Sequence, residues 1–173
     1  MLMEIQLQCR SALLAAADLD GALQLHDSDR IWYSIHGLLA ASGNLSKLLW
    51  PTRAASRARG VRLRELLEVH DNSPLRMRTM RDIFEHYDEQ LEDWASSSKR
   101  HIIVDQGVLP AGAIDGVDPG DYLRNLDPTV MEVSFRGKRV QLQPLVNAIV
   151  ALRESARAEV AREFLTATGG SQP

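Results

Sequence analysis

Apolar residues recur three or four positions apart through most of the chain, and this spacing predicts a mainly α-helical protein. A first helix is predicted over residues 3–19, with Asp20-Gly21 expected to end it. A second helix is expected to begin at Asp27 or Ser28, because either side chain can cap a first turn, and to end at Trp50-Pro51. Each helix has one apolar stripe, so we expect both to pack in a bundle.

Two further helices are predicted in the middle of the chain. The segment 51–60 is rich in arginine and is expected to be a connector, and residues 61–70 have helical period. The fourth helix is predicted to begin at Ser73, a favourable N-cap, and to run to about Trp94. Pro74 fits its first position, where the missing N–H costs no hydrogen bond.

Between residues 101 and 143 the pattern changes from helical spacing to alternation. The β-branched run 101–108 predicts a strand, the glycine-rich segment 107–120 a loop, and the alternating residues around Gly137 a hairpin. Helical spacing returns from about residue 144 to 167. The expected fold is therefore mainly α: a four- to five-helix bundle with a small antiparallel β insertion before the last helix.

Length and composition predict one globular domain. The chain has 173 residues, of which 45% are hydrophobic and 25% charged. The bundle is expected at 1–100 and 144–167, the β and loop insertion at 101–143 and a frayed tail at 168–173. Cys9 is the single cysteine, which excludes an internal disulfide and suits a reducing, cytoplasmic location. No apolar run reaches the roughly 18 residues of a membrane span, so no membrane partner is expected.

Positive and negative charge are separated along the chain, although the net charge is only −3. Residues 53–81 contain eight arginines and three acids, a net charge of +5, whereas residues 82–93 contain six acids and neither lysine nor arginine. Arginine suits bidentate contacts with phosphate, so the first segment is a candidate contact for a nucleic-acid backbone. A GC-rich genome, which favours arginine codons, explains the same excess without a function.

The predicted helix that spans this charge reversal carries the candidate chemistry. On a helical wheel its Met and aromatic residues form an apolar stripe, and His86 lies on the acidic side. Asp82 precedes His86 by four residues and Glu89 follows it by three, so both carboxylates are expected to raise the pKa of the imidazole. Such a histidine can donate a proton near neutral pH. The same three side chains also fit a metal ion, but no second ligand set accompanies them, and neither a metal nor another cofactor is expected.

Arg81, Asp82 and His86 form the motif R-D-x-x-x-H on a helix of a small bundle. The motif resembles the R-x(4–6)-H signature of the HEPN superfamily (higher eukaryotes and prokaryotes nucleotide-binding domains), in which a polar residue commonly follows the arginine. The resemblance covers the helical part, about residues 27–100 and the last helix. Many members of that family are metal-independent ribonucleases of toxin–antitoxin and other defence systems, with an active site formed across a homodimer. Others are non-catalytic binding modules.

The resemblance implies a homodimer that cleaves RNA, with RNA and an antitoxin protein as partners. Arg81 would hold the phosphate, His86 would move protons and Asp82 would orient His86. Cleavage through the 2′-hydroxyl needs a base on one side of the phosphorus and an acid on the other, and a twofold axis supplies a histidine to each side. The residues expected to bind around this centre are Arg76, Arg78, Tyr87, Glu89 and His36.

A non-catalytic interpretation explains the same residues. On an ideal helix Arg81 and His86 point about 140° apart, so they meet at one phosphate only through the reach of arginine, a kink or the second subunit. The acids around His86 repel phosphate, and they can pair with Arg81 and His86 at the surface or in an interface. The alternative function is therefore that of a helical-bundle accessory or interaction protein.

Overall fold

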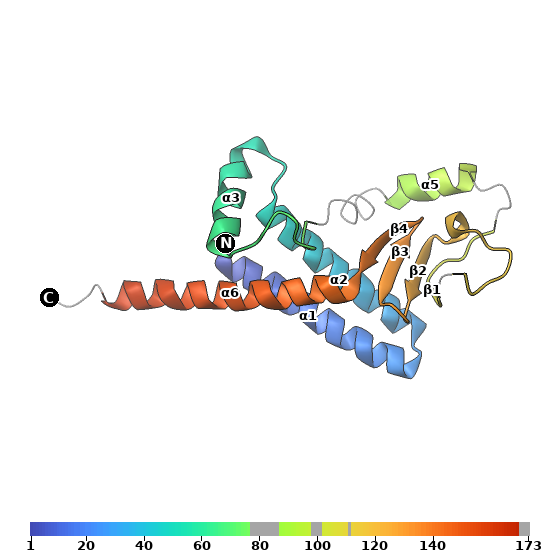
Figure 1. The fold of residues 1–173 in the computed structure, drawn as a ribbon, viewed down its shortest axis with the longest axis horizontal. Coiled ribbons are helices and arrows are strands. Elements are labelled where there is room, and N and C mark those ends of the chain that lie inside the picture. Colours follow the sequence, from blue (N-terminus) through green and yellow to red (C-terminus); the bar gives the residue numbers. More distant parts are fainter. Residues whose placement is uncertain (77–86, 98–101, 111, 170–173) are drawn as a thin grey trace.

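Two long antiparallel helices form the centre of the molecule, and a third crosses them (Figure 1). The computed structural model describes residues 1–76, 87–97, 102–110 and 112–169. Helix α1 (Leu2–Leu25) packs along helix α2 (Ser28–Leu49), and the last helix, α6 (Leu142–Gly169), packs on α1 and extends beyond it. The predicted fold, mainly helical with a small sheet before the last helix, is confirmed.

Helix α1 does not end at Asp20-Gly21, so that predicted boundary is wrong. Leu19 and Ala22, on either side of the dipeptide, are both buried in the core. Burial of this stripe outweighs the roughly 1 kcal/mol that a glycine costs inside a helix. The helix ends instead at His26, whose φ of 53° is left-handed and whose N–H bonds back to the last turn.

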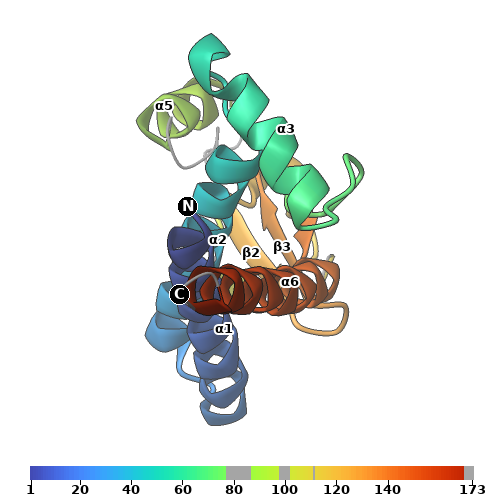
Figure 2. The same cartoon turned by 90° about the vertical axis from the view of Figure 1, so that its left-hand side faces the viewer.

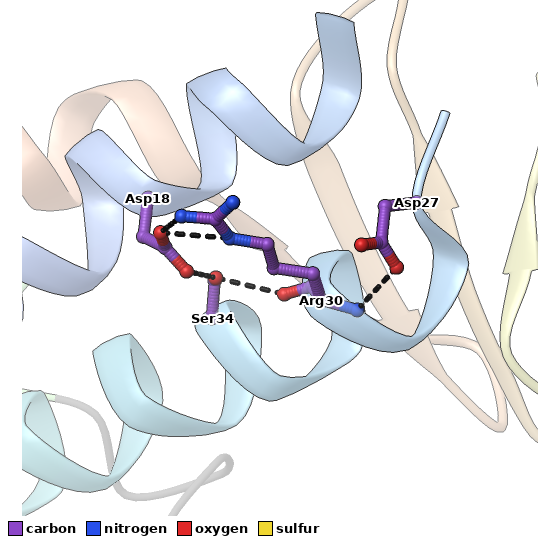
Figure 3. A network of polar contacts seen from close by, with 4 residues as sticks. All are labelled: Asp18, Asp27, Arg30 and Ser34. Carbon is purple, nitrogen blue, oxygen red and sulfur yellow. Dashed lines mark hydrogen bonds and ion pairs between the residues drawn. The ribbon is translucent and has the colours of Figure 1, made fainter. Parts of the chain in front are cut away.

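The start of α2 is capped as the sequence predicts, and a polar network fastens it to α1 (Figure 3). Asp27 Oδ1 accepts the backbone N–H of Arg30 at 3.1 Å. The Arg30 guanidinium in turn donates from Nε to Asp18 Oδ1 at 2.9 Å, and the Ser34 hydroxyl lies 2.8 Å from Asp18 Oδ2. The hydrogen bonds from Arg30 and Ser34 lower the pKa of Asp18. Arg30 and Asp18 therefore join the two helices at their turn.

Helix α3 (Arg57–Leu66) starts and ends four residues earlier than predicted. A 3-10 turn (Ala54–Ser56) leads into it, so most of the expected connector is helical. Gly60 allows this arrangement, because a Cβ at that position would lie 2.5 Å from Pro51 Cδ and 2.8 Å from the Leu49 carbonyl oxygen. The glycine that reads as a loop residue in the sequence thus marks the close approach of α3 to the end of α2.

The fourth helix does not begin at Ser73. Residues 74–76 form a turn in which Ser73 Oγ accepts the N–H of Leu75 at 3.3 Å and the Ser73 carbonyl accepts the N–H of Arg76 at 3.0 Å. The buried Leu75 side chain holds this turn against the core. The later part of the predicted helix is α5 (Tyr87–Ser97). Residues 77–86 lie outside the described residues.

The insertion is a four-stranded sheet in the order β1-β2-β3-β4. The strands are β1 (Gly107–Val108), β2 (Arg124–Asp127), β3 (Glu132–Phe135) and β4 (Lys138–Gln141). The predicted hairpin is β3–β4, with Gly137 at φ 78° in its turn, and β2 pairs antiparallel with β3. The predicted 101–108 strand is shorter than expected: Val104 forms an isolated bridge, and β1 pairs parallel with β2.

The sheet presents one apolar and one polar face. Leu126, Val133 and Phe135 belong to the same hydrophobic core as the helices. Figure 2 shows β2 and β3 behind α2 and α6. The alternate residues of β2 and β3 are polar and lie on the outer face. Helix α6 starts at Leu142, two residues before its predicted start, and Pro144 is tolerated because it lies in the first turn.

Cys9 lies on the buried face of helix α1. The Cys9 thiol is buried in the core, and this burial raises its pKa to about 12, which leaves it almost entirely protonated at neutral pH. Within the described part of the chain, no helix has the length and apolar character needed to cross a membrane.

Two glycine substitutions test the packing of α3 on α2. Gly60→Ala is expected to lower the free energy of unfolding by about 1–3 kcal/mol, because its Cβ overlaps the Leu49 carbonyl and Pro51. Gly43→Ala, inside α2 with no atom within 4 Å of the added Cβ, is expected to raise it by about 0.5–1 kcal/mol. Urea denaturation followed by circular dichroism measures both. Equal effects at the two positions would contradict the close approach at Gly60.

Candidate functional site

The predicted site residues are only partly described by the structure. The residues that lie outside the described ranges are Arg78, Arg81, Asp82 and His86, and their roles stay predictions. Tyr87 begins α5, and Glu89 lies exposed in its first turn. The described residues Arg76 and His36 occupy different surroundings.

Arg76 belongs to a polar cluster around Asp71. Its Nη1 donates to the Asp71 carbonyl at 3.3 Å and lies 4.0 Å from the carboxylate. The same carboxylate accepts the indole N–H of Trp50 at 2.9 Å and lies 3.4 Å from Arg64 Nε. The Trp50 hydrogen bond, helped by the two guanidinium charges, lowers the pKa of Asp71. Arg76 and Arg64 are therefore engaged in fixing the turn that follows α3.

Three other arginines of the basic segment face solvent. Arg53, Arg57 and Arg62 are exposed on the 3-10 turn and on α3, and none of them forms an ion pair with a described carboxylate. Their guanidinium groups therefore face solvent, and the contact with a phosphate backbone expected from the sequence stays a prediction. Arg59 is less accessible, since its Nε is buried.

His36 lies in a cluster where α2 meets the chain that enters the sheet. We call it the junction cluster; its members are Trp32, His36, Asp105 and Arg124. Arg124 forks onto Asp105, with Nε 2.7 Å from Oδ1 and Nη2 2.5 Å from Oδ2. The same guanidinium lies 6.0 Å from the centre of the Trp32 ring, and the Trp32 and His36 rings are 6.3 Å apart. Helix α2 thus contributes the rings of Trp32 and His36. Asp105, which precedes β1, and Arg124, the first residue of β2, contribute the ion pair.

Trp32 fixes the backbone next to this ion pair. Its side chain is buried, and Nε1 donates to the Gln106 carbonyl at 2.8 Å. Gln106 has a φ of 54°, and its N–H donates to Asp105 Oδ1 at 2.9 Å. The neighbouring Tyr33, by contrast, is 76% exposed. The two aromatic side chains therefore point to different environments.

The electrostatics of the junction cluster favour a neutral histidine. Burial of the imidazole is the main cause that lowers the pKa of His36, and the positive charge of Arg124 lowers it further, against the opposing effect of Asp105. Burial acts to raise the pKa of Asp105, but the hydrogen bonds and charge of Arg124 outweigh it and the pKa is lowered. At neutral pH His36 is thus an uncharged imidazole beside a locked carboxylate–guanidinium pair, able to donate one hydrogen bond and accept another.

Sequence reasoning found His36 but missed its partners. Trp32, Asp105 and Arg124 are separated by tens of residues, and no periodic pattern joins them. The only signal available was the isolated acid that follows the apolar run 102–104. Among the residues that the structure describes, no group of three or more His, Cys, Asp or Glu could hold a metal ion.

The pKa of His36 predicts how stability depends on pH. Because the folded state holds this pKa below 6.5, the unfolded chain binds the proton more readily, and stability falls as the pH is lowered through 6.5 towards the folded pKa. The free energy of unfolding is therefore expected to drop between pH 7 and pH 5, and less so in His36→Gln. Urea titrations at several pH values measure this. A steeper drop in the variant than in the wild type would contradict the assignment.

Comparisons with known proteins do not indicate a function for this chain. No protein-family model, no curated protein and no solved structure matches it. The HEPN resemblance therefore rests on the residues Arg81, Asp82 and His86 and on the helical context in which the sequence places them. Function has to be argued from the chemistry of the residues and tested directly.

Proposed function

We propose that the protein is a HEPN-like homodimer that acts in the cytoplasm as a metal-independent endoribonuclease of a toxin or defence system. The single observation that carries this proposal is the R-D-x-x-x-H motif at residues 81–86, directly before helix α5. Arg81 holds the scissile phosphate, His86 transfers protons and Asp82 orients His86. An antitoxin protein is the expected partner that restrains the activity.

The exposed positive charge on and around helix α3 supports contact with RNA. Arg53, Arg57 and Arg62 are exposed around α3, so the described part of the basic segment presents positive charge to solvent. Each arginine that neutralises a phosphate releases counterions, which makes binding strong at low salt and weak at high salt. Binding of this kind is independent of the RNA sequence.

The proposed reaction uses the 2′-hydroxyl of the RNA as the nucleophile. His86 of one chain takes the 2′-hydroxyl proton while the 2′-oxygen forms a bond to phosphorus. The bond from phosphorus to the 5′-oxygen breaks, and the partner subunit's His86 gives a proton to the leaving oxygen. Arg81 stabilises the negative charge that builds up on the phosphate oxygens. The products are a 2′,3′-cyclic phosphate and a free 5′-hydroxyl, and no metal or external water takes part.

Cleavage in the presence of EDTA tests the proposal. Purified protein is expected to cleave single-stranded RNA and to leave 2′,3′-cyclic phosphate ends, detected by mass spectrometry. His86→Ala and Arg81→Ala are each expected to slow cleavage by about 10²–10⁴-fold, because a proton-transfer group or a phosphate contact is lost. His70→Ala, at an exposed histidine outside the motif, is the matched control and should leave the rate unchanged.

Mixing chains tests whether the active site is shared. If each site needs both His86 side chains, an excess of His86→Ala chains should suppress wild-type activity by forming mixed dimers. If each chain acts alone, the same excess leaves the activity per wild-type chain unchanged. Full activity of His86→Ala itself, or a requirement for a divalent metal, would rule out the proposed reaction.

The exposed acids of α5 favour a second candidate function, a non-catalytic accessory protein. Asp88, Glu89, Glu92 and Asp93 are all exposed on this helix, and Asp93 approaches Arg136 at 4.0 Å. An acidic helix surface repels RNA and attracts a basic protein partner. A stable dimer that neither binds nor cleaves RNA, in wild type and His86→Ala alike, would favour this function over the ribonuclease.

A further inference from the structure

A small cavity between helices α1 and α6 lies apart from the residues of the proposed ribonuclease. Its volume is about 170 Å³, and it is formed where α6 packs on α1 (Figure 1). The residues that line it are Met3, Gln6 and Arg10 of α1 and Arg153 and Arg157 of α6. Most of these side chains are arginines, so positive charge is concentrated at this helix crossing.

A hydrogen bond beside the cavity fixes the two helices to each other. Gln6 is half-buried, and its Nε2 donates to the Ala156 carbonyl at 3.1 Å. Ala156 and Ile5, the neighbour of Gln6, are both fully buried in the core. The backbone positions that carry the arginines are therefore set by two packed helices and not by a loop.

The positive charge at the cavity is only partly neutralised. Arg157 Nη1 lies 3.6 Å from Glu154 Oε1, and both side chains are mostly exposed, so this ion pair is weak. The side chains of Arg10 and Arg153 form no hydrogen bond or ion pair with any described residue. Two guanidinium charges thus lack a carboxylate partner in the part of the chain that the structure describes.

The first acid of α1 lies on another side of the helix. Glu4 accepts from Gln8 Nε2 at 2.8 Å, and Gln8 Oε1 accepts from Asn44 of α2 at 3.2 Å. This side of α1 therefore faces α2, whereas Arg10 lines the cavity with residues of α6. Glu4 is thus engaged away from the arginines.

Convergence of the three arginines is unfavourable in the absence of an anion. Arg153 and Arg157 are four residues apart on α6, and like charges at this spacing destabilise a helix. Burial has the larger effect on the nearby Cys9 thiol and raises its pKa, whereas the charge of Arg153 acts to lower it, as expected for a guanidinium directed toward α1. Arg10 adds a third like charge from the other helix, and a bound anion would relieve the repulsion among them.

The number and charge of these donors favour a phosphate group over a carboxylate. Each guanidinium presents paired N–H groups to an anion. A carboxylate has only two oxygens, whereas a phosphate monoester has three terminal oxygens and a charge of about −1.5 to −2 near pH 7. That charge matches the two guanidinium groups of Arg10 and Arg153. A volume of 170 Å³ has room for several water-sized groups, which is enough for a phosphate group.

We propose that this cavity binds the phosphate group of a small phosphomonoester. Arg10 and Arg153 pair with its terminal oxygens, and Arg157 exchanges its exposed carboxylate partner for the ligand. Because Arg10 and Arg157 are exposed, the ester group of the ligand extends toward solvent. The proposal does not depend on the ribonuclease, since no residue of the site comes from the basic segment 53–81 or from the motif at 81–86.

Calorimetry with two ligands of the same shape tests the proposal on the full-length protein. Phenyl phosphate is mainly a dianion at about pH 7.5, whereas phenyl sulfate has the same ring and a tetrahedral head with a single charge. Phenyl phosphate is expected to bind and to raise Tm with concentration, and phenyl sulfate to bind at least about tenfold more weakly. Equal affinities would contradict recognition of a dianion, and no binding of phenyl phosphate would refute the site, whatever the ribonuclease assays show.

Arg153→Gln separates a binding role from a structural one. The change removes one member of the like-charge pair on α6, so Tm of the ligand-free variant should be unchanged or higher. Affinity for phenyl phosphate should fall about tenfold, and Arg10→Gln, on the other helix, should have the same effect. Lower Tm with unchanged affinity would show a structural arginine and overturn the proposal.

Arg162→Gln is the matched control on the same helix. Arg162 lies 2.9 Å from Glu159 and does not line the cavity, so its loss should leave the affinity for phenyl phosphate unchanged. An equal loss of affinity in Arg162→Gln and Arg153→Gln would show that phosphate is attracted by overall charge alone, and would refute the site.

The 5′-phosphate end of an RNA strand carries the same chemical group, and a further comparison distinguishes it from a small ligand. A short RNA with a 5′-phosphate and the same RNA with a 5′-hydroxyl are bound to His86→Ala chains, which are not expected to cleave them. Equal affinities of the two RNAs assign the cavity to a small phosphomonoester, as proposed. A gain from the 5′-phosphate that Arg153→Gln removes would assign it to RNA ends and overturn the small ligand.

Discussion

The docking of the sheet onto helix α2 through Trp32 determines how the rest of the molecule is arranged. The indole ring is buried in the core, and its N–H reaches the Gln106 carbonyl, in the segment that leads into β1. The ion pair of Asp105 with Arg124 fixes the first residue of β2 to the same place. A buried indole N–H needs a partner, so packing and polar pairing both require the sheet to lie here. The apolar face of the sheet then completes a core that the helices alone leave open.

The periodic part of the fold could be predicted from the sequence, and its boundaries could not. Apolar spacing located α1, α2 and α6 and the β3–β4 hairpin, because each of these elements buries one continuous stripe. The predicted helix end at Gly21 and the predicted connector that includes Gly60 were wrong for the same reason. Tertiary contacts decide whether a glycine ends a helix or lets two helices approach. Strand β2 was missed because Arg-Asn-Leu-Asp has little β propensity of its own and pairs only where its neighbours hold it.

Candidate chemistry could be proposed from the sequence only where it is local in the chain. The spacing of Asp82, His86 and Glu89 could be read directly, since residues three and four apart are neighbours on a helix. The partners of His36 come from α2, from the approach to β1 and from β2, and only the folded chain brings them together. The burial of the outer sheet face is equally hidden, because the alternation that predicts a polar strand face does not reveal that Asn125 and Asp127 are buried.

The two faces of the sheet show why the insertion is more than a support for the bundle. A sheet that only sealed the core would need an apolar inner face and a solvated outer one. Here the outer face buries Asn125 and Asp127 almost as fully as the inner face buries Leu126. Burial of polar atoms without partners lowers stability, and neither the Tyr122 hydroxyl nor Asn125 Oδ1 has a hydrogen-bond partner among the described residues. The outer face of the insertion therefore carries a free-energy cost that a sheet serving only to seal the core would not carry.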